Sequence, residues 1–167
     1  MKKLIFATHN INKVKEVRNQ LMGTYEILGL NDIGFHEEII EDKKTIVENS
    51  IAKVRFVKER TGYDCFADDT GLEVNALNGK PGVFSKRFAG QNASSDDNIN
   101  KLLNMLKGKR DRSAQFKTVI SLFNNGEIQT FEGICKGDIG FNRSGNFGFG
   151  YDPIFIPENK NISFGQM

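Results

Sequence analysis

The sequence predicts an α/β protein with a mixed β-sheet. Short apolar runs typical of strands alternate with segments whose apolar residues recur at helical spacing, in the order strand, helix, strand, helix, strand. A third helical segment is followed by two strand-like runs that flank Asn125-Gly126, a dipeptide that favours a tight hairpin. Helical crossovers join parallel strands and hairpins join antiparallel ones, so the two patterns together predict a mixed sheet.

Length and composition favour one soluble globular domain over residues 1–167, with no linker between two domains. Apolar residues make up 38% and charged residues 26% of the chain, and no apolar run approaches the roughly 20 residues that span a bilayer. The net charge of +2 is too small to indicate a nucleic-acid partner. Cys65 and Cys135 have no metal-ligand or redox spacing, so we expect two free thiols in a cytoplasmic protein.

The first strand, helix and second strand are expected at residues 3–8, 13–22 and 25–30. In the helix, Val14 and Val17 lie on one face with an apolar residue one turn further on.

The second helix has the clearest start signal in the chain. Thr45 and Glu48 match a capping box, with Thr45 as N-cap and Glu48 at the third helical position. The helix is expected to run to about Thr61 and to end at Gly62. We expect one of its faces to carry Val47, Ile51, Val54 and Lys58, with Lys53 to the side of that face.

Residues 66–90 are expected to form an ordered but irregular wall of an active site. Asp68 and Asp69 directly follow a short strand at residues 65–67, and Thr70 and Gly71 are expected to break that strand into a turn. Further turn signals follow at residues 78–79 and 81–82, yet the segment is too apolar for disorder.

The second half of the chain supplies a helix and a hairpin. Ser94 and Asp97 form a second box-like cap, and Gly108 ends the helix. Strands are expected at residues 115–123 and 127–136, and the glycine-rich residues 137–156 are expected to be turns.

Three carboxylates are candidate ligands of a hard metal ion. Asp68, Asp69 and Glu41 offer only oxygen ligands with no histidine or cysteine nearby, which favours Mg²⁺, with Mn²⁺ as an alternative. Neighbouring residues of a strand point to opposite sides, so the two aspartates would not normally share one ion. Either a turn at Asp69 brings them together, or they divide the work, with one binding the metal and the other positioning a water or capping a backbone N–H. An ordinary Asx-turn at Asp-Asp-Thr-Gly is the structural alternative.

The turn between the first strand and the first helix is a candidate phosphate site. Backbone N–H groups and the helix dipole favour an anion there, and Lys13 opposes the dipole unless an anion lies in front of it. Lys53, with Lys86 or Arg87, is a candidate to neutralise a polyphosphate. A polar loop with a solvated lysine is the alternative, and neither GxxxxGK[ST] nor GxGxxG occurs.

Residues 147–153 are a candidate site for a flat ligand. Glycines beside aromatic residues let a base approach the backbone, and Phe149 or Tyr151 is a candidate to stack on it. A glycine-bulged core strand is the alternative.

Three segments together, FATHNINK, FADDTGLEVNALNGKPGVFSKRFAG and FGYDPIF, resemble the inosine triphosphate pyrophosphatase (Ham1-like) family over nearly the whole chain. The resemblance implies an elongated mixed sheet with flanking helices and two lobes around a central cleft, and a homodimer. It implies Mg²⁺-dependent hydrolysis of dITP, ITP or XTP to the monophosphate and pyrophosphate.

The resemblance also implies roles for individual residues. Asp69 corresponds to the proton acceptor, and Glu41 and Asp69 to metal ligands with Asp68 nearby. Substrate contacts are implied for Thr8, His9, Asn10, Ile11, Asn12, Lys13, Lys53, Thr70, Phe149, Gly150, Tyr151 and Asp152.

Two departures from the family pattern bear on these expectations. Lys43-Lys44 stands where the family has a glycine, which bears on the path of the loop that carries Glu41. The family continues past Met167 with a lysine, a Ser-His-Arg motif and a helix that help select the base, so we expect weaker base selectivity from residues 1–167. The alternatives are therefore a catalytically impaired nucleotide-binding homologue and a pyrophosphatase of different base specificity.

Overall fold

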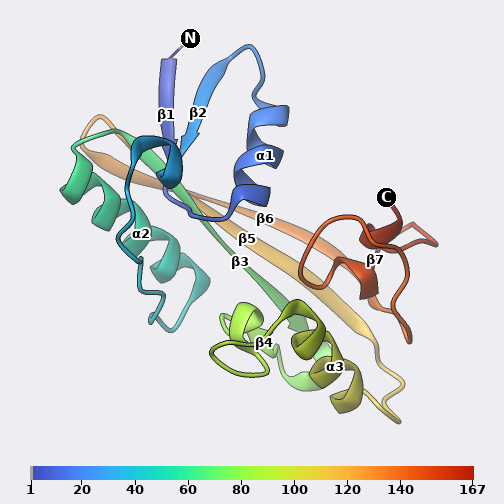
Figure 1. Ribbon diagram of the computed structural model, residues 1–167. Helices are drawn as coiled ribbons and strands as arrows, with labels where there is room; N and C mark the ends of the chain where they lie inside the picture. The colour runs from blue at the N-terminus through green and yellow to red at the C-terminus, as the bar shows by residue number, and fades with distance from the viewer. Residues whose placement is uncertain (1) are drawn as a thin grey trace. The chain divides into compact units, whose positions relative to one another are not determined.

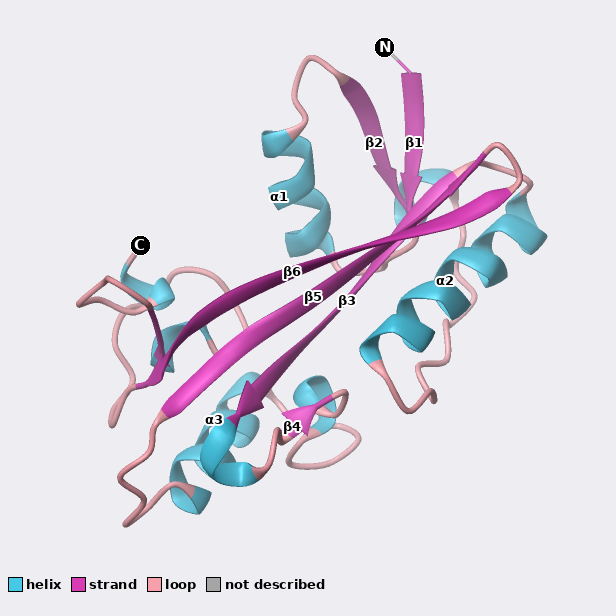
Figure 2. Cartoon of the chain, turned by 180° about the vertical axis from the view of Figure 1, so that it is seen from behind, coloured by secondary structure: helices cyan, strands magenta, loops and turns pink. Residues whose placement is uncertain are grey.

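The predicted mixed sheet with flanking helices is confirmed in a computed structural model, which describes residues 2–167. In this part of the chain the strands follow the order β2-β1-β3-β5-β6-β7, and β4 pairs with β3. β1 is parallel to β2 and β3, whereas β4 and β7 are antiparallel to their partners. Figure 1 traces the chain, and Figure 2 shows β3, β5 and β6 running side by side.

Most elements lie close to the predicted ranges, but β3 is longer than predicted, β4 was not predicted, and β6 and β7 extend into residues 137–156, which were expected to be turns. The strands are β1 (Lys2–Phe6), β2 (Tyr25–Gly29), β3 (Cys65–Val74), β4 (Pro81–Gly82), β5 (Ser113–Asn124), β6 (Glu127–Ile139) and β7 (Phe155–Pro157). The helices are α1 (Ile11–Gln20), α2 (Ile46–Thr61) and α3 (Ser95–Met105). None of the helices within residues 2–167 is both long enough and apolar enough to cross a membrane.

The chain divides into two compact units. Unit 1 comprises residues 1–69 and 119–132, and unit 2 comprises residues 70–118 and 133–167. Strands β3, β5 and β6 each contribute residues to both units. The central cleft implied by the resemblance stays a prediction, as does the expected single domain.

Unit 1 has three layers, in which alternate residues along a strand pack against different helices. Ile5 of β1, Ala7 directly after this strand, and Cys65 and Ala67 of β3 share a core with Val54 and Val57 of α2. Phe6 and Phe66, the residues between them, belong to another core with Val14 of α1, and their rings stack with centroids 4.4 Å apart. Successive side chains of a strand point to opposite faces, so α2 covers one face of β1 and β3 and α1 covers the other.

Unit 2 is built around one apolar core. Leu72 and Val74 of β3 pack with Ile99 and Leu102 of α3 and with Phe155 of β7. The predicted cap of α3 is confirmed, because the Ser94 hydroxyl accepts a hydrogen bond from Asp97 N at 3.1 Å and Asp97 Oδ2 accepts one from Ser94 N at 2.9 Å.

The predicted turn after Asp69 is wrong. β3 continues unbroken from Cys65 to Val74, and residues 66–90 then contain short 3₁₀ helices and β4 rather than one irregular wall. The strand continues because its neighbours satisfy its backbone: Leu72 and Glu73 pair with β4 in unit 2, and β1 pairs with its start in unit 1.

The buried face of α2 differs from the face on which Val47, Ile51, Val54 and Lys58 were placed, although the predicted ends of the helix are right. Thr45 and Glu48 form the capping box, and Gly62 takes a left-handed conformation with φ 71° at the C-terminal end. The buried stripe, however, is Ile46, Asn49, Ser50, Lys53, Val54 and Val57. Half of these residues are polar, so a count of apolar spacing alone selects the wrong face.

Candidate active site in unit 1

The two neighbouring aspartates lie on opposite faces of β3. Asp69 has the parity of Cys65 and Ala67, which pack toward α2, and Asp68 has the parity of Phe66, which packs toward α1. Accordingly, Asp68 contacts Lys13 of α1 and Asp69 contacts Lys53 of α2. The position of each residue along the strand, rather than a turn, divides the two acids between two sets of partners.

The loop before α1 is held by its own side chains. The Thr8 hydroxyl accepts a hydrogen bond from Asn10 N at 3.1 Å. Asn10 is the N-cap of α1, and its side-chain oxygen accepts hydrogen bonds from Asn12 N at 3.0 Å and Lys13 N at 3.4 Å. Asn10 therefore occupies two of the backbone donors that start the helix. Ile11 opens α1 with its side chain largely exposed.

Lys13 has an anion in front of it, as the sequence suggested, and that anion is Asp68. Lys13 Nζ lies 2.5 Å from Asp68 Oδ2, and both side chains are mostly buried. An ammonium in the first turn opposes the helix dipole, and the carboxylate of Asp68 offsets that unfavourable field. A phosphate group would be a second anion for the same ammonium.

Lys53 is the centre of the second set of charges. Its side chain is only 7% exposed, and its ammonium forms an ion pair with Glu41 and lies 3.6 Å from Asp69 Oδ1. The ammonium also donates a hydrogen bond to the backbone oxygen of Asp68 at 2.9 Å. Two carboxylates from distant parts of the chain thus converge on one buried cation.

The charges in this cluster shift one another's protonation. Burial by itself would lower the pKa of Lys53, but Glu41, Asp69 and Asp68 together outweigh burial and raise it. Burial raises the pKa of Asp69 above its ordinary value, and Glu41 adds to the rise, while the Lys53 ammonium opposes both. Asp69 is therefore a carboxylate whose affinity for a proton is increased, which is a useful property in a general base.

The oxygen ligands expected for Mg²⁺ are partly assembled. Glu41 and Asp69 meet around one cation, whereas Asp68 is directed to Lys13. Within residues 2–167 no three His, Cys, Asp or Glu side chains are grouped so that they could hold a metal ion. Mg²⁺ is commonly bound by one or two carboxylates together with substrate phosphates and water. A pair of carboxylates with no nitrogen or sulfur ligand fits that ion.

His9 links the loop before α1 (residues 8–13, here called the phosphate loop) to residues 37–43, an acidic loop that contains Glu37, Glu38, Glu41 and Asp42. Its Nε2 lies 2.9 Å from the Glu37 carbonyl oxygen, which can only accept, so Nε2 carries the proton and donates it. Nδ1 lies 3.2 Å from Asn31 Oδ1, and the ring stacks against Phe35. In this structure both ring nitrogens of His9 are directed to protein atoms.

The remaining candidate residues belong to unit 2. The Thr70 and Thr118 hydroxyls lie 2.8 Å apart, and the geometry allows either one to donate. Asp152 Oδ2 accepts a hydrogen bond from Phe149 N at 2.8 Å, which fixes the turn around Gly150. Burial raises the pKa of Asp152, and the Phe149 N–H opposes that rise.

Tyr151 does not have the exposed ring that stacking on a base requires. It is 5% exposed, belongs to the core of unit 2, and donates its hydroxyl proton to the Ser85 carbonyl oxygen at 2.7 Å. Phe149 and Gly150 instead line a cavity of about 360 Å³ together with Phe147. Of the two stacking candidates, Phe149 is the one that borders open space.

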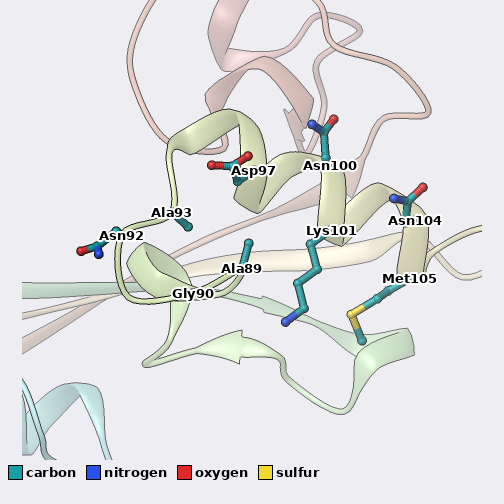
Figure 3. Close-up of a pocket in the computed structure, with 9 residues that line it drawn as sticks. All are labelled: Ala89, Gly90, Asn92, Ala93, Asp97, Asn100, Lys101, Asn104 and Met105. Atoms are coloured by element: carbon teal, nitrogen blue, oxygen red, sulfur yellow. The ribbon is translucent and has the colours of Figure 1, made fainter.

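A second hollow in unit 2 contains none of the predicted site residues. This open groove of about 790 Å³ lies along α3 and the segment before it, and Figure 3 shows its lining. Asn92, Asn100 and Asn104 contribute amides, and Lys101 donates to the Phe88 carbonyl oxygen at 2.6 Å. Nothing in this lining resembles a reactive arrangement of groups.

Sequence reasoning missed Asn49, a polar residue next to the site. Asn49 is 1% exposed, and its Oδ1 accepts a hydrogen bond from Lys43 N at 3.0 Å. It lies one helical turn before Lys53 on the buried stripe of α2. An available signal was that both polar residues, four positions apart, share a face with Ile46 and Val57.

Comparison with known proteins agrees with the resemblance. The Ham1 family matches residues 4–167. A dITP/XTP pyrophosphatase of Flavobacterium psychrophilum is 52% identical over 164 residues, which cover 98% of this chain and 86% of the relative. A dITP/XTP pyrophosphatase of Porphyromonas gingivalis is 48% identical over 168 residues, with coverage of 100% and 87%.

Solved structures of two Ham1 proteins are also similar to this chain. The Ham1 protein of Staphylococcus aureus has a TM-score of 0.87 at 36% identity and covers 99% of this chain and 86% of its own. A HAM1 protein from Coxiella burnetii has a TM-score of 0.89 at 35% identity, with coverage of 100% and 87%. With a family match over almost its whole length and relatives near 50% identity, the chain belongs to the Ham1 family.

Proposed function

We propose that this chain hydrolyses non-standard purine nucleoside triphosphates, namely dITP, ITP or XTP, to the monophosphate and pyrophosphate, and so cleanses the nucleotide pool. Relatives at 48–52% identity named dITP/XTP pyrophosphatase support the substrate class. The observation that carries the proposal is the buried Lys53 ammonium flanked by Glu41 and Asp69, because it combines a cation for phosphate with two carboxylates.

The roles divide between the two faces of β3. On the α1 face, the turn at residues 8–13 supplies the Lys13 ammonium to a triphosphate, together with those of its backbone N–H groups that the Thr8 and Asn10 side chains do not occupy. On the α2 face, Lys53 holds Glu41 and Asp69 in place and is a second cation for phosphate oxygens. Asp69 accepts the proton of the attacking water, a role that the raised pKa of its buried carboxyl supports.

Glu41 and Asp69, with Asp68 nearby, are the residues that would hold Mg²⁺, or Mn²⁺ in its place. When bound, the ion would neutralise phosphate charge and favour ionisation of a coordinated water. Three carboxylates face two ammonium groups in unit 1, so negative charge is in excess and a cation would be bound favourably there.

Residues of unit 2 are proposed to recognise the base. Phe149 and Gly150 border the cavity of about 360 Å³, which supports stacking by Phe149. Asp152 holds the backbone of that turn, Tyr151 supports it from the core, and Thr70 contacts the substrate through its hydroxyl or backbone.

We further propose a homodimer that works in the cytoplasm, without a nucleic-acid or membrane partner. The free state of Cys65 and Cys135 supports a reducing compartment, and the family resemblance supports the dimer. Light scattering coupled to size-exclusion chromatography would contradict the dimer if the mass in solution were that of one chain.

A panel of nucleoside triphosphates tests the function. Pyrophosphate release from dITP, ITP, XTP, dUTP, GTP and ATP would be measured with Mg²⁺, with Mn²⁺ and with EDTA. We expect the highest kcat/KM with a 6-keto non-standard purine, and loss of turnover in EDTA. A preference for dUTP or ATP would overturn the base assignment, and binding of dITP without pyrophosphate release would favour an impaired nucleotide-binding protein.

A further inference from the structure

Asn49 is buried at a position where its amide group must be satisfied by protein atoms. It lies on α2 and is 1% exposed. Its Oδ1 accepts the hydrogen bond from Lys43 N at 3.0 Å. A backbone N–H can only donate, so the amide oxygen of Asn49 faces Lys43 and its NH₂ group faces the other way.

Two side chains of α2, one helical turn apart, hold the same acidic loop. Asn49 holds the backbone at Lys43, and Lys53 forms the ion pair with Glu41, two residues earlier. Residues four apart on a helix lie on one face, so together they fix two points of the loop against the helix. This anchor also explains how Glu41 reaches Lys53 although lysines replace the glycine expected in the loop.

The other side of the Asn49 amide is directed to Asp69. A side-chain hydrogen bond joins Asn49 to Asp69, and because an ionised carboxylate can only accept, the NH₂ group of Asn49 donates it. Asn49 precedes Lys53 on the buried stripe, and Lys53 Nζ itself lies 3.6 Å from Asp69 Oδ1. The Asn49 amide group therefore connects the backbone of Lys43 in the acidic loop to the carboxylate of Asp69 on β3.

We propose that Asn49 is a positioning residue for the hydrolysis: its amide joins the backbone of Lys43 to the carboxylate of Asp69 and sets the distance between Glu41 and Asp69. This inference rests on the proposed function, because it assigns the two carboxylates to the reaction. The phosphate loop at residues 8–13 is held by its own side chains, Thr8 and Asn10, and not by the hydrogen bond that Asn49 accepts from Lys43.

The experiment compares Asn49→Ala and Asn49→Asp with a matched control, Val57→Ala. Val57 lies on the same helix and is fully buried in the apolar core, so its truncation loosens α2 without touching the polar cluster. The readouts are kcat and KM for dITP with Mg²⁺, and the hydrogen-exchange rate of the Lys43 amide in the metal-free protein.

We expect Asn49→Ala to lower kcat at least tenfold with KM changed less than threefold, because the residues proposed to grip phosphate are untouched. Exchange at the Lys43 amide should accelerate at least tenfold. Asn49→Asp keeps an acceptor oxygen for Lys43 but has no N–H for Asp69, so exchange should stay within threefold of wild type while kcat still falls at least tenfold. Val57→Ala should lower the melting temperature and keep kcat within twofold.

Several results would overturn the inference. Asn49→Ala with kcat within threefold of wild type, or with unchanged Lys43 exchange, would remove the positioning role. Restored kcat in Asn49→Asp would reduce Asn49 to a loop anchor that does not act on Asp69. If the wild-type chain released no pyrophosphate from any nucleotide, the proposed function would fail separately, and the exchange rates would still test the bond to Lys43.

Discussion

Replacing Lys53 by methionine removes the cation on which Glu41 and Asp69 converge. Methionine is close to lysine in length and keeps most of the buried apolar contact, so the change isolates the charge. Lys53 is 7% and Asp69 is 11% exposed at the side chain, while Glu41 is 27% exposed. Removing one partner of a buried pair typically costs about 3–5 kcal/mol, and the partial solvation of Glu41 places this case at about 3 kcal/mol.

The loss of folding stability caused by Lys53→Met should be larger at neutral pH than at acidic pH. The pKa of Lys53 is raised, so its stabilisation is complete below its ordinary pKa and is present throughout pH 5–8 in the wild type. In the variant, Asp69 loses the ammonium that opposes burial, so its pKa rises further. A carboxyl pKa that is raised in the folded state destabilises that state at a pH above the ordinary pKa, and lowering the pH relieves this effect because the carboxyl gains a proton.

The assay is thermal unfolding by circular dichroism at pH 5.0 and pH 7.5 in EDTA. With about 2–4 °C per kcal/mol for a chain of this size, the melting temperature should fall by about 6–12 °C at pH 7.5. At pH 5.0 the fall should be smaller. Lys58→Met is the matched control, because Lys58 contacts Gly62 and Asp64 at the surface and should cost about 1 kcal/mol or less. A fall under 3 °C at pH 7.5, or an equal fall at both pH values, would refute the reasoning.

Three further predictions follow from single residues. Asp69→Asn should lower pyrophosphate release at least about 100-fold with an unchanged circular dichroism spectrum, and turnover within tenfold of wild type would remove Asp69 from the chemistry. Burial raises the pKa of the Cys65 thiol to about 11, so at pH 8 a maleimide should label Cys65 only in denaturant; labelling of native Cys65 within minutes would contradict its buried position. Gly145 has φ 80°, and an added Cβ would lie 1.8 Å from the Gly165 carbonyl oxygen; Gly145→Ala should therefore cost about 2–4 kcal/mol. Gly108→Ala, with φ 73° and open space around it, is the control for backbone strain alone, and equal melting temperatures of these two variants would show that the contact with Gly165 is unimportant.

Much of the fold could be predicted because its signals are local. The capping boxes at Thr45 and Ser94 use side chains and N–H groups within four residues of each other, and Gly62 ends α2 through its own φ angle. The Asn125-Gly126 turn also depends only on its own residues. Such features are encoded by neighbours in the sequence, and the structure has them where they were expected.

The buried face of α2 and the length of β3 could not be predicted in that way. Asn49 and Lys53 can be buried because residues outside α2 satisfy their polar groups. Lys43 pairs with Asn49, and Glu41 and Asp69 pair with Lys53. β3 continues past Asp69 because strands from elsewhere in the chain pair with it, which outweighs the local turn signal.

The sequence by itself determined the chemistry of the candidate site: oxygen-only carboxylates that follow a short apolar strand, and a polar strand-to-helix turn with a lysine in the first helical turn. Tertiary structure alone decided which groups meet. Because β3 alternates between the α1 and α2 faces, Asp68 pairs with Lys13 and Asp69 joins Lys53 and Glu41. Pairings across 12 to 55 residues depend on strand position and helix packing, which no local pattern of residues encodes.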